Sequence, residues 1–311
     1  MKTDKREQLQ RDVTNSIIET IEEGGLLPWQ CPWQSSGSQG LPFNESTKER
    51  YNGINTLLLW GAAMKRGYQS QAWLTFKQAQ SLGGNVKKGE KSVRCIYYKP
   101  LLKTEINTFT GEEEDITIPM MKPFSVFNLE QIDGIEPSDI SVNSPIKEEF
   151  FDLDIVKNAE NLVARYATQV GLTIEKSGNT PSYYPLADRI KIPNVCFDSP
   201  EDYASTLFHE CIHSTGPKTR TGRLDKFESL FNNSKKAYAM EELVAACGEA
   251  FMCAEFGYWG KHLQHETYIN SFLKALKDDH TFIFKAAAAA SKAVTFIFDN
   301  ASKQIFVSDA A

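Results

Sequence analysis

The sequence predicts an α+β protein of two domains: a small α+β domain over residues 1–136 and a mainly helical domain with a small sheet over residues 150–311. Three observations lead to this prediction. The length of 311 residues suffices for two domains of ordinary size. The stretch 137–149 is polar and contains two prolines, which is typical of a linker. Helix-like and strand-like apolar patterns occur on both sides of that stretch.

In the first domain, apolar residues at helical spacing predict a helix that stops at Gly24-Gly25 and a second helix that enters near residue 55 and leaves at Gly67. Residues 73–84 are typical of a strand turning into a short helix. Residues 86–99 predict a basic turn followed by a strand, and 124–129 a returning strand of the same sheet. The acidic run 112–115 is interpreted as part of a separate insertion.

In the second domain, the spacing from residue 151 to 166 predicts an amphipathic helix that ends at Gly171. Two strands are expected at 172–175 and 188–192. A buried helix follows, with Asp198, Ser199 or Asp202 as its N-cap. Helices are also expected over 239–252, 272–276 and 283–293, and the alanine run 286–290 favours close packing of the last one.

The most specific motif is His-Glu-x-x-His, which runs from His209 to His213. Residues four apart lie on one face of a helix, so both imidazoles can reach one metal ion while Glu210 lies beside them. This is the pattern of zinc peptidases, in which the glutamate is the general base. The sequence therefore predicts a Zn²⁺ site, or one for another divalent metal, with Glu210 as the catalytic residue.

A catalytic zinc site normally has three protein ligands, so a third must come from another segment. The helix predicted over 239–252 offers several carboxylates. Glu242 is the preferred ligand, because the small residue Ala245 follows it at i+3. Glu241 remains an alternative, and Glu249 a further one. At i+4 from Glu242 stands Ala246, so a carboxylate that would orient a ligand histidine is missing there, and Glu249 or a water is expected to substitute.

Charge and composition restrict the class of protein. The net charge is −6, yet residues 45–99 carry ten Lys or Arg against three Asp or Glu. That local excess of positive charge favours contact with phosphates. There is no signal-peptide core and no apolar run of membrane-spanning length, so we expect a cytoplasmic protein without a membrane partner. The six cysteines form no Cys-x-x-Cys pair, which favours buried free thiols.

Aromatic side chains alternate with these cations, as on surfaces that bind single-stranded nucleic acid, where bases stack on aromatic faces. On composition alone, the core of a small domain is the favoured role of these aromatic residues. The candidate nucleic-acid contacts are Trp29, Trp33, Arg50, Tyr51, Asn55, Trp73, Lys77, Lys87, Lys88 and Lys91.

An ordered series of motifs covers nearly the whole chain: Pro28-Trp29, Tyr51-Asn52-Gly53-Ile54-Asn55, Trp73-Leu74-Thr75-Phe76-Lys77-Gln78-Ala79, Val86-Lys87-Lys88-Gly89-Glu90, Val126-Phe127-Asn128-Leu129, Asp188-Arg189-Ile190-Lys191-Ile192-Pro193, Arg223-Leu224 and Tyr238-Ala239-Met240-Glu241-Glu242-Leu243. In these motifs the chain resembles the ArdC-type antirestriction proteins of mobile elements. The resemblance implies a single-stranded-DNA-binding N-terminal domain and a zincin-like metallopeptidase domain. The chain departs from the family pattern at Ala246, where Glu is usual.

Together these observations predict an antirestriction protein that binds single-stranded DNA and hydrolyses a peptide bond in an unknown protein substrate. In such peptidases a sheet edge holds the extended substrate, and residues 184–193 are the candidate. Two alternatives remain. The metal site could be structural or vestigial in a protein that only covers DNA, for which Ala246 is the chief argument, or the chain could be a peptidase toxin.

Overall fold

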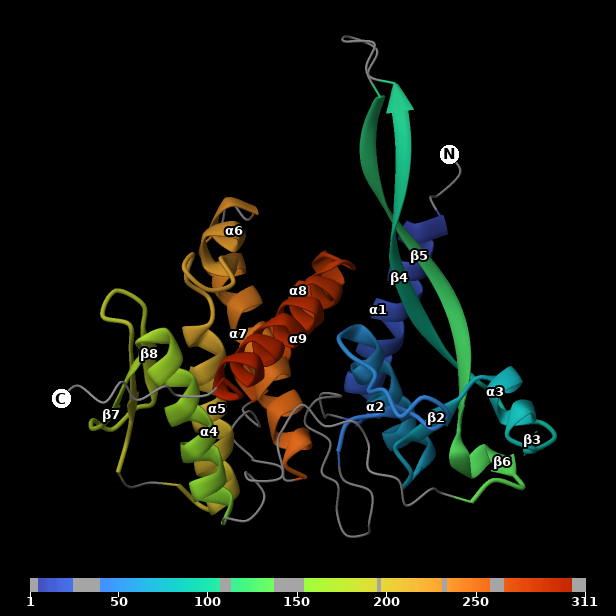
Figure 1. Ribbon diagram of the computed structural model, residues 1–311, viewed down its shortest axis with the longest axis horizontal. Coiled ribbons are helices and arrows are strands. Elements are labelled where there is room, and N and C mark those ends of the chain that lie inside the picture. Colours follow the sequence, from blue (N-terminus) through green and yellow to red (C-terminus); the bar gives the residue numbers. More distant parts are fainter. Residues whose placement is uncertain are drawn as a thin grey trace.

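The computed structural model describes residues 5–24, 40–106, 113–136, 154–194, 197–230, 234–257 and 266–303. The mixed α+β architecture agrees with the prediction: an N-terminal part of helices and small sheets lies beside a C-terminal part dominated by helices (Figure 1). The expected linker 137–149 lies outside the described residues. The expected boundaries therefore stay a prediction.

The N-terminal part begins with α1 (Lys5–Gly24) and contains a four-stranded sheet in the order β1-β2-β5-β4. Its further elements are β1 (Phe43–Asn44), α2 (Ile54–Arg66), β2 (Ala72–Leu74), α3 (Phe76–Ser81), β3 (Asn85–Val86), β4 (Val93–Ile106), β5 (Glu113–Asn128), a 3₁₀ turn η2 (Leu129–Gln131) and β6 (Ile132–Asp133). A capping box starts α3, because Thr75 and Gln78 each bond the other's backbone N–H. Gly67 ends α2 at φ 72°, a conformation that favours glycine.

Strands β4 and β5 form one long antiparallel hairpin that projects away from the body of the molecule (Figure 1). Its register pairs Val93 with Val126 near the sheet and Ile106 with Glu113 at the far end. The interpretation of the acidic run as a separate insertion is therefore wrong for residues 113–115, which are paired strand residues. β4 is also an edge of the sheet, so one side of its backbone is not paired with another strand.

The C-terminal part contains a small sheet and a group of packed helices. Its elements are α4 (Ile155–Val170), β7 (Thr173–Lys176), β8 (Ser182–Tyr184), β9 (Arg189–Ile192), α5 (Pro200–Ser214), α6 (Arg223–Leu230), α7 (Ser234–Glu255), α8 (Glu266–Asp278) and α9 (Phe282–Ala301). The sheet order is β7-β9-β8, so β9 is the central strand and, within the expected segment 184–193, only Tyr184 lies on an edge strand. Helix α7 packs against α5 on one side and α9 on the other. The alanine run lies in α9, with Ala286, Ala287 and Ala290 fully buried.

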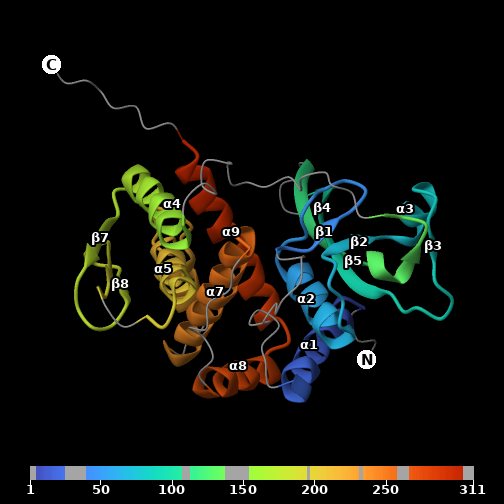
Figure 2. The ribbon, with the colours of Figure 1, turned by 90° about the horizontal axis from the view of Figure 1, so that it is seen from below.

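One cluster of buried side chains includes residues from both parts of the chain. It contains Ile21 of α1 and Trp60 of α2 together with much of α5, α7 and α9. The Trp60 ring lies 5.7 Å from that of Phe251, centroid to centroid. The Thr14 hydroxyl donates to the backbone oxygen of His280 at 2.7 Å. Seen from below, α9 lies between the other C-terminal helices and α2 (Figure 2). The two parts therefore share a core.

Among the described residues, no single helix has the length and apolar character needed to cross a membrane. The segments Phe272–Asp278 and Phe282–Ala301 meet these criteria only as a pair, and they are bent by 119° where they join. In the described part of the chain, Cys95, Cys211, Cys247 and Cys253 are buried free thiols.

Candidate functional site

The His-Glu-x-x-His motif lies in the last two turns of α5. Ser199 caps this helix, accepting the backbone N–H of Asp202 at 3.1 Å, and Pro200 occupies the first turn, where a missing N–H costs nothing. His209 and His213 face each other, with their Nε2 atoms 3.1 Å apart. The helix thus places two imidazole nitrogens close enough together to bind one metal ion.

Helix α7 positions the side chain of Glu242, the third candidate metal ligand. Glu242 Oε2 lies 3.6 Å from His209 Nε2, and Glu242 Oε1 lies 3.7 Å from His213 Nε2. One ligand atom from each of these three residues lies within 4.8 Å of the other two. The distances suit three ligands around one ion rather than three direct bonds between side chains.

The Nδ1 atom of His209, the nitrogen that does not face His213, is hydrogen-bonded to a carboxylate. That carboxylate lies one helical turn beyond Ala246 on α7. His209 Nδ1 lies 3.1 Å from Glu249 Oε2, and both side chains are buried. Because Glu249 is seven residues after Glu242, it returns to the same face of α7. The orienting carboxylate that Ala246 cannot provide is therefore supplied by Glu249.

The outer nitrogen of His213 is held by a buried ion pair. His213 Nδ1 lies 2.9 Å from Glu241 Oε1, and Arg223 donates to both oxygens of Glu241, at 2.9 and 2.7 Å. Arg223 also donates to the backbone oxygen of Ile212 at 2.6 Å and to the hydroxyl of Thr215. Glu241, the alternative third ligand, is thus bonded to Nδ1 of His213, on the side of the imidazole opposite Nε2.

The charges at the site are strongly coupled. Burial alone would lower the pKa of His209, but Glu242 and Glu249 outweigh burial and raise it to about 10. Burial alone would raise the pKa of Glu242, but His209 and His213 lower it to about 2. The positive charge of a protonated imidazole and the negative charge of the carboxylate thus favour each other, and a divalent cation held by these residues would compete with the proton for His209.

Two further side chains border the three donors. Glu210 is buried and, within the described ranges, makes no hydrogen bond or ion pair, so its carboxylate can accept a proton. Tyr238 lies one turn before Glu242 on α7, is 62% exposed and donates a hydrogen bond to that carboxylate. The site is therefore open on the Tyr238 side.

The donor set fits a divalent cation. Two imidazole nitrogens and one carboxylate oxygen are ligands of Zn²⁺ and of other transition metals. Because Glu249 and Glu241 occupy the two Nδ1 atoms, the Nε2 atoms remain for the metal. Three protein ligands also leave a coordination position for water or substrate.

The candidate nucleic-acid contacts do not form one cluster, as the metal ligands do. Trp73 is fully buried, so its ring is a core residue and offers no stacking face. Asn55 bonds the backbone of Ile96 in both directions at 2.8 Å, which attaches α2 to β4. Arg50 forms a buried ion pair with Glu255 of α7. Contacts within the fold thus hold Arg50 and Asn55, whose DNA contacts stay predictions, whereas the buried Trp73 ring has no surface on which a base could stack.

The remaining candidates are placed as follows. Tyr51 is half-buried, and its hydroxyl accepts the Asn44 amide at 3.3 Å. Lys77, Lys87, Lys88 and Lys91 are exposed, although Lys87 also donates to the backbone oxygen of Glu130 at 2.8 Å. Trp29 and Trp33 lie outside the described residues.

Sequence reasoning overlooked three exposed aromatic residues near these cations. Tyr97 and Tyr98 on β4 are 53% and 58% exposed, and Phe76 at the start of α3 is 49% exposed. Lys122 is the strand partner of Tyr97, and Arg94 precedes it on β4. The dipeptide Tyr97-Tyr98 in a basic strand was the available signal.

Comparisons with known proteins identify relatives of both parts of the chain. Residues 7–127 match the model of the N-terminal domain of anti-restriction factor ArdC, and residues 158–289 match a zincin-like metallopeptidase model. The crystal structure of the antirestriction protein ArdC from plasmid R388, without metal, is similar at a TM-score of 0.72 and 35% identity, over 94% of this chain and 97% of that one. Its Mn(II)-bound form is similar at a TM-score of 0.72 and 34% identity, over 95% and 98%.

Two curated relatives also match nearly the whole of this chain. The uncharacterized protein y4eC of Sinorhizobium fredii is 32% identical, over 94% of this chain and 93% of its own length. The DNA primase TraC of Escherichia coli is 33% identical over 94% of this chain, which spans only 27% of that primase. With both halves matched in order and full-length relatives above 30% identity, the chain belongs to the ArdC family of antirestriction proteins.

Proposed function

We propose that this protein binds single-stranded DNA through its N-terminal part and is a metal-dependent peptidase at the site between α5 and α7. The observation that carries the enzymatic half is the convergence of His209, His213 and Glu242, whose ligand atoms lie within 4.8 Å of one another. The Mn(II)-bound form of the R388 protein, a relative of nearly the same length, further supports a divalent cation. Zn²⁺ and Mn²⁺ both suit the donors.

When bound, a divalent cation supplies Lewis-acid chemistry: it polarises a peptide carbonyl and makes a water molecule easier to deprotonate. Glu210 would accept that proton and return it to the leaving amine, as a general base and then a general acid. Glu249 and Glu241 would hold the two imidazoles in one orientation, and Arg223 would keep Glu241 ionised.

The DNA-binding half rests on the family and on the exposed side chains of the N-terminal part. Tyr97 offers an aromatic face, with Lys122 opposite it and Arg94 on the same strand. Lys77, Lys87, Lys88 and Lys91 add positive charge nearby in the chain. Aromatic faces that accept bases, beside cations that follow the backbone, are the usual means of binding single strands.

A DNA-covering protein with a structural metal is the second candidate. Its chief support in the sequence was Ala246, which removes an orienting carboxylate. The contact of Glu249 with His209 at 3.1 Å weakens that support, because the carboxylate is supplied from another position. We therefore place the peptidase first.

The two candidates separate in one set of measurements on Glu210→Gln. We expect this variant to keep its metal, to keep its affinity for a single-stranded oligonucleotide within about twofold, and to lose hydrolysis of unstructured protein substrates. Restriction of transferred DNA is then compared in cells with each form. Full protection by the variant would assign antirestriction to DNA covering alone, and wild-type protein that holds metal without cleaving any peptide library would contradict the peptidase proposal.

A further inference from the structure

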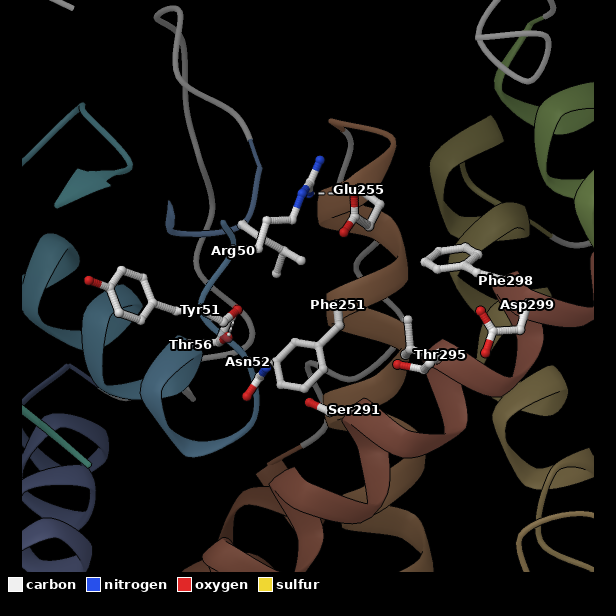
Figure 3. Close-up of a pocket in the computed structure, with 12 residues that line it drawn as sticks. Arg50, Tyr51, Asn52, Thr56, Phe251, Glu255, Ser291, Thr295, Phe298 and Asp299 are labelled. Atoms are coloured by element: carbon white, nitrogen blue, oxygen red, sulfur yellow. Dashed lines mark hydrogen bonds and ion pairs between the residues drawn. The ribbon is translucent and has the colours of Figure 1, made fainter. Parts of the chain in front are cut away.

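A pocket of about 410 Å³ lies where the two parts of the chain meet (Figure 3). One wall is the segment Arg50–Asn52 and the start of α2, and the other is formed by α7 and α9. Pockets for small ligands span about 300–1,000 Å³. This pocket is near the lower limit, which suits one small group.

The lining combines an apolar floor with a polar rim. The ring of Phe251 occupies the centre in Figure 3, and Leu41, Val294 and Phe298 add apolar surface. On α9, the polar side chains Ser291, Thr295 and Asp299 follow one another at intervals of four residues, so they form one stripe along the pocket. The exposed Asn52 amide lies on the opposite wall. Hydroxyl, amide and carboxylate groups thus surround an apolar surface.

The charges of the pocket do not suit a phosphate. Arg50 is paired with Glu255, and Asp299 adds a second carboxylate, so the charged lining residues sum to one negative charge. Asp299 is exposed on the rim, where it can accept a hydrogen bond from an incoming group. The occupant should therefore carry no negative charge and be able to donate a hydrogen bond to a carboxylate.

We propose that this pocket holds a single unpaired nucleobase with an exocyclic amino group, cytosine or adenine, from the bound DNA strand. The proposal rests on the single-strand binding given under the proposed function. Recognition of single strands commonly splays bases out, places them against apolar or aromatic surface and bonds their edges. A carboxylate accepts from the cytosine amino group, and an amide such as Asn52 matches the adenine edge. Thymine lacks that amino group.

The N-terminal wall of the pocket packs against strand β5. This wall includes Tyr51, whose ring stacks on Phe124 at 6.4 Å between centroids. Phe124 is two residues from Lys122, the strand partner of the exposed Tyr97. The wall of the pocket is therefore packed against the same strand that carries Lys122.

The first test fills the pocket without disturbing the core. Thr295 is exposed on α9 and lines the pocket, so Thr295→Trp should occlude it. Ala288→Trp is the control, because Ala288 is exposed on the same helix and is not part of the lining. We expect Thr295→Trp to weaken binding of oligodeoxycytidylate to the full chain at least fivefold and Ala288→Trp to change it less than twofold, measured by fluorescence anisotropy. Equal affinity of both variants would overturn the proposal.

The second test concerns the amino group. Wild-type protein should prefer oligodeoxycytidylate to oligodeoxythymidylate, and Asp299→Leu, which removes the acceptor, should reduce that preference at least threefold while binding of oligodeoxythymidylate stays within twofold. An unchanged preference would remove Asp299 from base recognition and refute the proposal, with single-strand binding intact. If wild-type protein binds neither oligonucleotide, the proposed function itself fails. Binding of N-acetylarginine amide in place of deoxycytidine would assign the pocket to a basic side chain of a protein partner instead.

Discussion

The metal site and the DNA surface of this protein differ in how their residues are brought together. The metal donors come from two helices, α5 and α7, packed side by side in the core. The candidate DNA contacts in the described residues are distributed over the segment before α2, α2, β2, α3 and the β3–β4 turn. Three of them make contacts within the fold. A site built on helix periodicity is therefore predictable from local sequence, whereas a surface depends on which side chains tertiary packing leaves exposed.

The largest expected effect tests the support of the metal site. Arg223→Met would leave the buried carboxylate of Glu241 without its guanidinium partner. Loss of one partner of a buried ion pair typically costs about 3–5 kcal/mol, and we expect that decrease in the free energy of unfolding in urea. Lys218→Met, on the exposed loop before α6, should change it by less than about 0.5 kcal/mol. Similar stability of the two variants would mean that the network around His213 contributes little.

Loss of a ligand should come next. His213→Ala removes one of three donors, and we expect metal affinity to fall at least about 100-fold, equivalent to about 2.7 kcal/mol. Competition with a fluorescent chelator measures this change. Glu210→Gln should keep metal affinity within about threefold, because Glu210 is not one of the three donors. Retention of stoichiometric metal by His213→Ala would show that the ligands are different residues.

The same contrast explains how much of the site could be predicted from the sequence. His209, Glu210 and His213 follow from a four-residue spacing, and Glu242 from the pattern of a second helix. The sequence left Glu249 or a water as the partner of a ligand histidine, and the contact of Glu249 with His209 depends on how α7 crosses α5, which local spacing does not determine. Arg223 lies on α6, outside both helices, so its bonds to Glu241 could not be predicted.

The fold shows a similar limit. Most helices and strands match the apolar patterns, because burial of one face fixes the period. The far end of the β4–β5 hairpin escaped prediction, since its charged residues Glu113 and Glu114 pair across the hairpin without a period-two apolar pattern. Burial of Trp73 beneath α2 was equally hidden, because a tryptophan among lysines fits a core as well as a surface.

A smaller effect tests the DNA surface. Tyr97→Ala should weaken binding of a single-stranded oligonucleotide about fivefold, because loss of one stacked base costs roughly 1 kcal/mol or more. The ring is 53% exposed, so stability should change little. Trp73→Phe should show the opposite pattern, with lower stability and unchanged DNA affinity at temperatures where it remains folded. Equal DNA affinity of Tyr97→Ala and wild type would remove β4 from the interface.

The smallest effect is electrostatic. Replacing Lys87 and Lys88 by alanine should reduce the slope of log affinity against log salt by about 1.4, if each lysine contacts one phosphate of a single strand. Lys218 and Lys226, both exposed in the C-terminal part, are the control pair and should leave that slope unchanged. An equal change for the two pairs would indicate general attraction rather than a defined path for the strand.

The assignment of the metal ligands is tested most directly by anomalous diffraction from crystals loaded with Mn²⁺ or Zn²⁺. The arrangement predicts one strong peak at about 2.0–2.3 Å from both Nε2 atoms and from a Glu242 oxygen, with Glu249 and Glu241 still on the Nδ1 atoms. A peak coordinated by Glu241 or Glu249 instead of Glu242, or a site that stays empty at millimolar metal, would contradict it.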